Sequence, residues 1–163
     1  MKSQVDWKAL KKYSVHATFF LAFIYLVGII GFFIPITKPI FMRLVPVNLI
    51  FSAAFLVLFN RPFTRRLGIV LLIIYLAGFV LEWVGVKTGL LFGAYEYGQA
   101  LGWKVADVPV IIGLNWAMLV YMTYSIFIPV RMHWLLKTLA ASALMLLYDI
   151  MLEPVAIKLD FWH

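Results

Sequence analysis

Cysteine is absent from the 163-residue chain, and both histidine and acidic residues are scarce. Without cysteine there is no disulfide, no thiolate nucleophile and no iron–sulfur ligand set. His16, His133 and His163 are far apart and form no paired motif, which argues against zinc and against the histidine-rich di-iron sites of membrane desaturases. A glycine-rich phosphate loop, a dinucleotide fingerprint and a paired-aspartate motif for magnesium diphosphate chemistry are also missing. We therefore expect chemistry that uses no metal and no cofactor.

Apolar residues dominate what is present. They make up 65% of the chain, whereas soluble domains contain about 45–50%. The composition therefore predicts an integral membrane protein with membrane lipids as neighbours. The net charge of +7 does not indicate a nucleic-acid partner, because the basic residues lie between apolar runs and mark loops. The apolar run from Val15 is too long for a signal peptide and is expected to be a retained helix.

The apolar runs predict an all-α, polytopic transmembrane helix bundle that forms one integral membrane domain over residues 1–163. About five spans are expected, at roughly 14–36, 40–60, 67–88, 107–129 and 134–157. Asp107 is expected to cap the fourth span, with Pro109 in its first turn. The loop of roughly 18 residues before that span is long for a small bundle, and long loops are often functional.

The distribution of positive charge predicts the orientation. The N-terminus, with Trp7 and Tyr13 suited to the membrane interface, the turn at 61–66 and the turn at 131–137 together carry 9 of the 14 lysines and arginines. Cytoplasmic loops carry an excess of these residues, so we expect the N-terminus in the cytoplasm and the C-terminus outside. A prokaryotic inner (cytoplasmic) membrane is the expected location.

The segment EWVGVKTGLLFGAYEY, which begins at Glu82, places an acid inside an apolar run. Burying a charge in hydrocarbon is costly, so such an acid is a functional candidate by default. Glycines at positions 85, 89 and 93 let other backbone come close. One helical face, expected to be buried, comprises Gly78, Glu82, Gly85 and Gly89. The structural alternative is a tight helix end at which Glu82 pairs with Lys87.

Acids from different spans are expected at one depth of the bilayer. Glu82 and Asp149 each lie about 15 residues into an outward span, roughly 22 Å from its inner end, and Glu153 lies one turn beyond Asp149 on the same face. Asn115 and Trp116 enter the same outer half from the fourth span. The structural alternative for Asp149 and Glu153 is interfacial ion pairing. The lysines available for such pairs are Lys87, Lys104 and Lys158.

Carboxylic acids in an apolar, aromatic pocket suit one class of chemistry. A buried carboxylic acid can hold a proton near neutral pH and protonate an electron-rich alkene to a tertiary carbocation. Aromatic faces stabilise such a cation, and a second carboxylate can take a proton from an attacking water. Addition of water gives hydration, loss of a proton gives isomerisation, and attack by an internal alkene gives cyclisation. Residue types alone do not separate these three outcomes.

Three stretches carry a resemblance to a known family. They are Glu82–Tyr97, Val108–Trp116 (VPVIIGLNW) and Tyr148–Trp162 (YDIMLEPVAIKLDFW). Together they resemble the membrane carotenoid-biosynthesis family that contains the carotenoid 1',2'-hydratases, of the bisanhydrobacterioruberin and γ-carotene hydratase type. The resemblance implies addition of water to the terminal double bond of an acyclic carotenoid, or another polyisoprenoid lipid, without a redox cofactor. Because family members are generally longer, a second copy of this chain is a candidate partner.

We accordingly assign roles to the acids as hypotheses. Asp149 is the expected proton donor, Glu82 its partner or the base that accepts a proton from water, and Glu153 a third acid. The side chains expected to bind the substrate are Thr88, Phe92, Tyr95, Tyr97, Asn115 and Trp116. The alternatives left open are a cyclase or isomerase with the same proton donor, and a non-catalytic carotenoid-binding or assembly subunit. A transporter is less favoured, because no internal repeat is visible.

Overall fold

The computed structural model describes residues 12–60 and 63–163, and five helices with one short hairpin make up its regular structure. The elements are α2 (Ser14–Phe33), α3 (Lys38–Asn60), α4 (Arg65–Thr88), β1 (Lys104–Val105), β2 (Val108–Pro109), α5 (Ile111–Phe127) and α6 (Trp134–Lys158). Four of these helices are long and apolar enough to cross a membrane, and α5 is a shorter apolar helix of 17 residues. The predicted all-α transmembrane fold is confirmed. Trp7, Arg61, Pro62 and the lysines at positions 2, 8 and 11 lie outside the described residues.

The chain divides into two compact units, residues 1–67 and 68–163, which are described separately. The prediction of one integral membrane domain is not tested by this division and stays a prediction. In the first unit α2 packs against α3. The ring of Phe41 occupies the space that a side chain at Gly31 would need. The hydroxyls of Tyr25 and Ser52 are 3.0 Å apart and share a hydrogen bond between the two helices.

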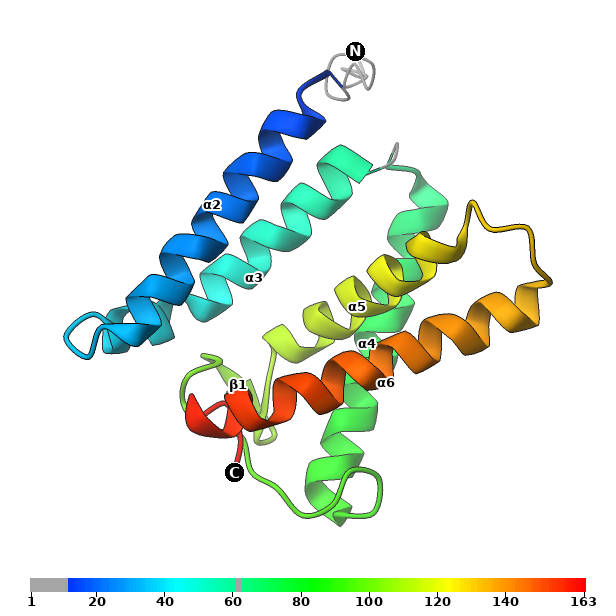
Figure 1. Cartoon of the computed structure of the whole chain (residues 1–163). Coiled ribbons are helices and arrows are strands. Elements are labelled where there is room, and N and C mark those ends of the chain that lie inside the picture. Colours follow the sequence, from blue (N-terminus) through cyan, green and yellow to red (C-terminus); the bar gives the residue numbers. More distant parts are fainter. Residues whose placement is uncertain (1–11, 61–62) are drawn as a thin grey trace, which may run out of the picture. The chain divides into compact units, whose positions relative to one another are not determined.

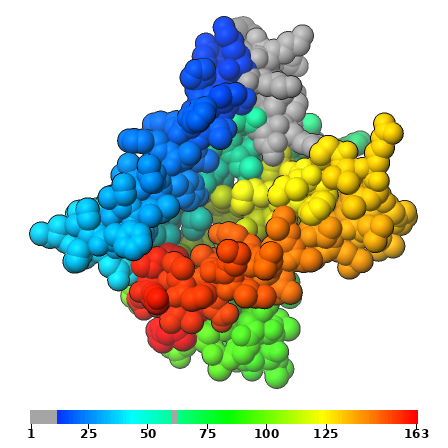
Figure 2. All heavy atoms as spheres, in the orientation of Figure 1, coloured from blue at the N-terminus to red at the C-terminus, as the bar shows by residue number. Residues whose placement is uncertain are grey.

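In the second unit α5 and α6 run side by side in opposite directions, and α4 crosses behind them (Figure 1). Helix α5 supplies much of the buried core, because Ala117, Met118 and Leu119 are all less than a tenth exposed. Helix α6 instead carries large exposed apolar side chains such as Leu139 and Met151. Much of α6, drawn in orange to red, lies at the viewed surface (Figure 2). Such a helix is suited to contact lipid on its outer face.

The loop between α4 and α5 contains a feature that the sequence did not predict. Strands β1 and β2 pair antiparallel, and the two residues between them, Ala106 and Asp107, both have positive φ, at 51° and 70°. Positive φ at both central residues is the signature of the type I′ turn that suits a hairpin. Asp107 therefore lies in a turn and Pro109 lies in β2, so the prediction that Asp107 caps the fourth span with Pro109 in its first turn is wrong. The helix begins later, at Ile111 after Val110, because residues 104–109 form the hairpin.

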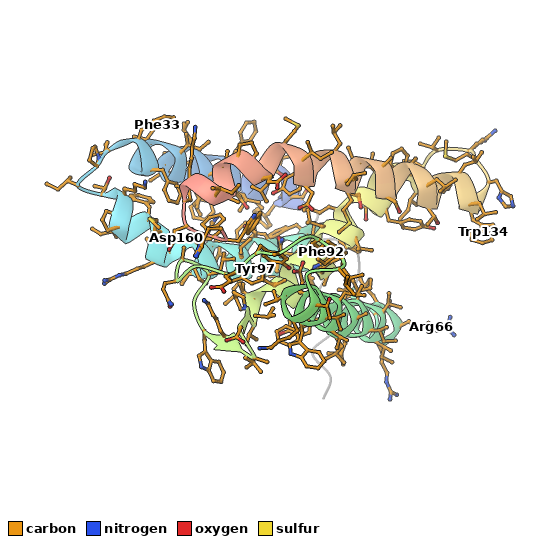
Figure 3. All side chains as sticks on the ribbon, turned by 90° about the horizontal axis from the view of Figure 1, so that it is seen from below. Phe33, Arg66, Phe92, Tyr97, Trp134 and Asp160 are labelled. Atoms are coloured by element: carbon orange, nitrogen blue, oxygen red, sulfur yellow. The ribbon has the colours of Figure 1, made fainter. Side chains whose placement is uncertain are left out.

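The end of the chain pairs with this loop. The Glu96 N–H donates to the His163 carbonyl at 2.8 Å, and the His163 N–H donates to the Glu96 carbonyl at 3.0 Å. Tyr97 and Trp162, the neighbouring residues, form an antiparallel bridge next to this pair. The segment after α6 thus holds the loop before α5. Trp134 and Asp160 mark the two ends of α6 in Figure 3, and this pairing lies at the Asp160 end.

Candidate functional site

Glu82 lies near the end of α4 and accepts hydrogen bonds from three side chains. The hydroxyls of Tyr95 and Tyr97 both donate to Oε2, the latter at 2.8 Å. The indole Nε1–H of Trp116 donates to Oε1 at 2.9 Å. The carboxylate is partly buried, and its donors come from the loop and from α5. Glu82 and Trp116, which were expected only in the same half of the bilayer, are therefore joined by a hydrogen bond, and the two tyrosines share the carboxylate.

Glycines on α4 make this arrangement possible. A Cβ at Gly78 would lie 2.5 Å from Cγ of Trp116, so only glycine admits the indole at this point. Gly85 lies about one turn after Glu82 in the sequence, and a Cβ at Gly85 would lie 2.7 Å from the Phe92 ring. Both glycines are buried, as expected for this face of the helix. The small residues therefore bring the aromatic groups onto the helix that carries the acid.

Tyr95 and Tyr97 have strongly altered acidity. Burial is the largest cause that raises the pKa of each phenol, and the neighbouring Glu82 raises it further. The rings meet edge to face with centroids 5.5 Å apart. Since the neutral phenol is the favoured form, each hydroxyl acts as a hydrogen-bond donor to Glu82 and not as a base.

Asp149 and Glu153 lie on α6, and both side chains are exposed. The charges of Glu82 and Glu153 act on Asp149, and the charge of Asp149 acts in turn on Tyr95. Asp149 therefore belongs to the electrostatic surroundings of Glu82, although no hydrogen bond joins the two acids. Within residues 12–60 and 63–163, no lysine, arginine or histidine forms an ion pair with Asp149 or Glu153.

Lys87 pairs with a different acid from the one suggested as the structural alternative. Its Nζ lies 2.6 Å from Oδ2 of Asp107 in the hairpin turn. The hydrogen bond and charge of Lys87 lower the pKa of Asp107. Glu82 is left to its three neutral donors, so the explanation of Glu82 as the ion-pair partner of Lys87 is wrong.

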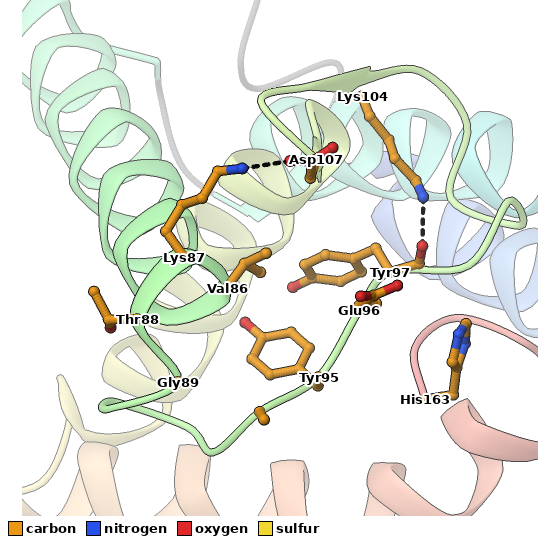
Figure 4. Close-up of a pocket in the computed structure, with 11 residues that line it drawn as sticks. Val86, Lys87, Thr88, Gly89, Tyr95, Glu96, Tyr97, Lys104, Asp107 and His163 are labelled. Carbon is orange, nitrogen blue, oxygen red and sulfur yellow. Dashed lines mark hydrogen bonds and ion pairs between the residues drawn. The ribbon is translucent and has the colours of Figure 1, made fainter.

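A cavity of about 930 Å³ lies at the end of α4, between the loop and the end of the chain. Its lining comprises Val86, Lys87, Thr88, Gly89, Ala94, Tyr95, Glu96, Tyr97, Lys104, Asp107 and His163. Figure 4 shows the two tyrosine rings projecting into it, with Lys104 donating to the Tyr97 carbonyl. We call this space the loop cavity.

The remaining residues expected to bind substrate are placed differently. Thr88 lines the loop cavity, and its hydroxyl donates to the Val84 carbonyl at 2.6 Å. Phe92 packs on Gly85 next to the Tyr95 hydroxyl. Asn115 is half-buried on α5, and its side chain makes no hydrogen bond to any residue that the structure describes. Asn115 therefore does not join the cluster around Glu82.

The hydrogen bonds leave Glu82 with one free position. An ionised carboxylate has about four lone-pair sites for hydrogen bonds. Three are filled, two on Oε2 and one on Oε1. The remaining site on Oε1 can accept a hydrogen bond from a water or a hydroxyl group. Over the described ranges, no group of three or more metal-ligating side chains occurs.

The second unit thus combines apolar membrane helices with a carboxylate that three aromatic side chains hold in place. Residues 42–163 match the family described as carotenoid biosynthesis protein, and the chain belongs to this family. This match covers α4, α5, α6 and the loop that carries the tyrosines. Membership of the family connects the protein to carotenoid metabolism.

A curated relative gives a more specific comparison. The chain is 31% identical over 103 residues to bisanhydrobacterioruberin hydratase of Haloarcula japonica. The aligned part is 60% of this chain and 35% of the relative, so the chain matches about a third of the relative's length. No solved structure matches the chain.

Proposed function

We propose that the protein is a carotenoid hydratase, a hydro-lyase that adds water to the terminal double bond of an acyclic carotenoid without a cofactor. The observation that carries this proposal is the Glu82 carboxylate, held by three donors with one acceptor site left. Membership of the carotenoid family and the similarity to a hydratase support the choice of substrate and reaction. The location proposed with this function is the inner membrane of a prokaryote.

In this proposal Asp149 is the acid. Its carboxyl proton is transferred to the terminal alkene carbon, and the neighbouring carbon becomes a tertiary cation. Its exposure on α6 leaves room for the end group of a lipid substrate. The ionised Glu82 stabilises the positive charge through space, and the face of Trp116 offers a further stabilising contact. Glu153, which lies one helical turn beyond Asp149 on α6, is the third acid of the proposal.

Glu82 is the base in the second step. Water bonded at its free site attacks the cation, the C–O bond forms, and the water gives one proton to Glu82. Return of a proton from Glu82 to Asp149 restores the starting state. One water is added for each end group, and no electrons are transferred, so neither an oxidant nor a reductant is needed.

Production of the protein in a bacterium that accumulates lycopene tests the proposal. Chromatography and mass spectrometry of the pigments should show a more polar product heavier by one or two waters. Asp149→Asn and Glu82→Gln should each lower the yield by roughly a hundredfold, within the usual range for loss of a general acid or base. Asp6→Asn, which alters the one acid that precedes residue 68 in the sequence, is the matched control and should leave the yield unchanged.

Other pigment outcomes would overturn the hydratase proposal in defined ways. An unchanged mass with a shifted absorption spectrum would indicate isomerisation or cyclisation by the same acid. Unaltered lycopene that co-purifies with the protein would indicate a binding subunit. Full activity in folded Asp149→Asn and Glu82→Gln would show that the acids are assigned wrongly.

A further inference from the structure

The loop cavity and Glu82 share two side chains. Tyr95 and Tyr97 line the cavity, and their hydroxyls donate to Glu82, which is not itself in the lining. Figure 4 shows both rings projecting into the space between the end of α4 and the end of the chain. The two tyrosines, which we call the tyrosine wall, therefore line the cavity and also bind the carboxylate.

The size and lining of the cavity suit water. Charged side chains, Lys87, Lys104 and Asp107 among them, surround it, and these groups would not favour an apolar polyene. A volume of about 930 Å³ corresponds to on the order of 30 waters at the liquid volume of about 30 Å³ each. A hydratase acting on a lipid must bring water to an apolar site. Two side chains that line this cavity, Tyr95 and Tyr97, are hydrogen-bonded to Glu82.

We propose, resting on the hydratase activity proposed above, that the loop cavity supplies the water of the reaction to Glu82. Tyr97 and Tyr95 are positioning residues: they hold Oε2 of Glu82 so that Oε1 faces the incoming water. The delivered water forms the new C–O bond with the cation and gives one O–H proton to Glu82. Because Asp149 supplies the other proton and is reprotonated from Glu82, the net change is addition of one water.

The tyrosine wall is anchored on both sides. Lys104 donates to the Tyr97 carbonyl, and the Trp162 ring meets the Tyr97 ring edge to face at 6.2 Å. The Gly98 N–H donates to the Phe161 carbonyl at 2.9 Å, and a Cβ at Gly98 would lie 2.0 Å from the Asp160 carbonyl oxygen. Such anchoring fixes the Tyr97 hydroxyl against Glu82. An obstruction in the cavity should slow the supply of water and leave carotenoid binding unchanged, because the charged lining does not favour the carotenoid.

Ala94 gives access to the cavity without touching Glu82. It lines the cavity, is exposed, and can be replaced by cysteine in a chain that has no other cysteine. Ala94→Cys in native membranes is treated with a positively charged, water-soluble methanethiosulfonate and then supplied with lycopene. Leu90→Cys is the matched control, because Leu90 lies in the same loop, is 84% exposed and is not in the lining.

Labelled Ala94→Cys should form the hydrated product at least roughly tenfold more slowly, with KM for lycopene unchanged. The cation, deprived of water, should lose a proton instead, so the ratio of isomerised to hydrated pigment should rise. A reducing thiol removes the label and should restore hydration, which shows that the protein stayed folded. Labelled Leu90→Cys should behave as the wild type.

Three results would overturn the water route. Ala94→Cys that does not react would mean that water does not fill the cavity. Full labelling with unchanged hydration would mean that water arrives elsewhere, while the hydratase function stands. A wild-type protein that forms no hydrated pigment would remove the hydratase function and this route together, and that result is visible before any label is added.

Tyr97→Phe tests the positioning role separately. It keeps the ring contact with Trp162 but removes one donor to Glu82. The expected result is a lower kcat with an unchanged KM and a higher proportion of isomerised pigment. Tyr124→Phe, on the exposed side of α5, is the control. An unchanged product ratio in folded Tyr97→Phe would contradict a positioning role for this hydroxyl.

Discussion

Glu82 is stable inside a membrane helix because its hydrogen bonds replace those that water would make. Loss of one partner of a buried acceptor costs about 1–3 kcal/mol, and more where the acceptor is charged. Three neutral donors satisfy the carboxylate without neutralising it, whereas a lysine partner would cancel its charge. A carboxyl group held in this way keeps a fixed position, as the role proposed for it beside a cationic intermediate requires.

The same contacts make the two tyrosines resistant to ionisation. Since burial and Glu82 raise the pKa of Tyr95 and Tyr97, both should stay neutral above about pH 10, where free tyrosine ionises. Their contribution to the free energy of unfolding is full below about pH 10 and is lost as the pH rises toward the folded-state pKa. The folded wild type and the Tyr95→Phe/Tyr97→Phe variant should therefore show equal rises in 295 nm absorbance up to about pH 11. A wild-type rise that exceeds the variant's rise by the absorbance of two ionised tyrosines would contradict this expectation.

Helix α4 organises the site through its glycines. Gly78 lets the Trp116 indole lie across the helix, and Gly85 does the same for the Phe92 ring. Glycine weakens a helix by up to about 1 kcal/mol relative to alanine. That cost is offset here by packing that no larger residue allows.

Gly78→Ala should disrupt the site from within α4. The new Cβ would lie 2.5 Å from Cγ and 2.6 Å from Cβ of Trp116, and these atoms are too near the backbone to swing aside. We expect a loss of about 1–3 kcal/mol in the free energy of unfolding, as for other overpacked cores, and a weakened Trp116–Glu82 hydrogen bond. Thermal unfolding in detergent, followed by circular dichroism, measures the change. Gly28→Ala is the control, because nothing lies within 4 Å of its added Cβ and alanine favours the helix; an equal loss there would show that the clash with Trp116 is not responsible.

The sequence predicted the helices better than the loop. Hydropathy located each helix to within a few residues because long apolar runs leave few alternatives, whereas depth along the spans placed Glu82 and Trp116 only in the same half of the bilayer. The hairpin was missed because Ala106 and Asp107 occupy positive-φ positions that usually require Asn or Gly. The tyrosines were expected to bind substrate, but the direction of a hydroxyl depends on tertiary contacts such as the pairing of Tyr97 with Trp162, which no local pattern records.

The pairing between the loop and the end of the chain also determines how α5 relates to the membrane. The segment before α5 and the segment after α6 are hydrogen-bonded, so they lie on one side of the bilayer. Helix α6 has 25 residues and is long enough to cross. Its start must then lie on the opposite side, where α5 ends. We therefore predict that α5 crosses as well, although it is only about 26 Å long, against about 30 Å of hydrocarbon.

Cysteine labelling in intact cells tests this topology against a background free of native cysteine. Trp103→Cys, in the loop before α5 and 80% exposed, should react with a membrane-impermeant maleimide from outside. Met132→Cys, in the turn between α5 and α6, should react only after the cells are permeabilised, because the nearby positive charges of Arg131 and Lys137 favour the cytoplasm. The reverse pattern would invert the orientation but keep α5 as a span. Reaction of both from the same side would mean that α5 does not cross. A crossing α6 would then place Glu96 and His163 on opposite sides of the bilayer, which their hydrogen bonds do not allow.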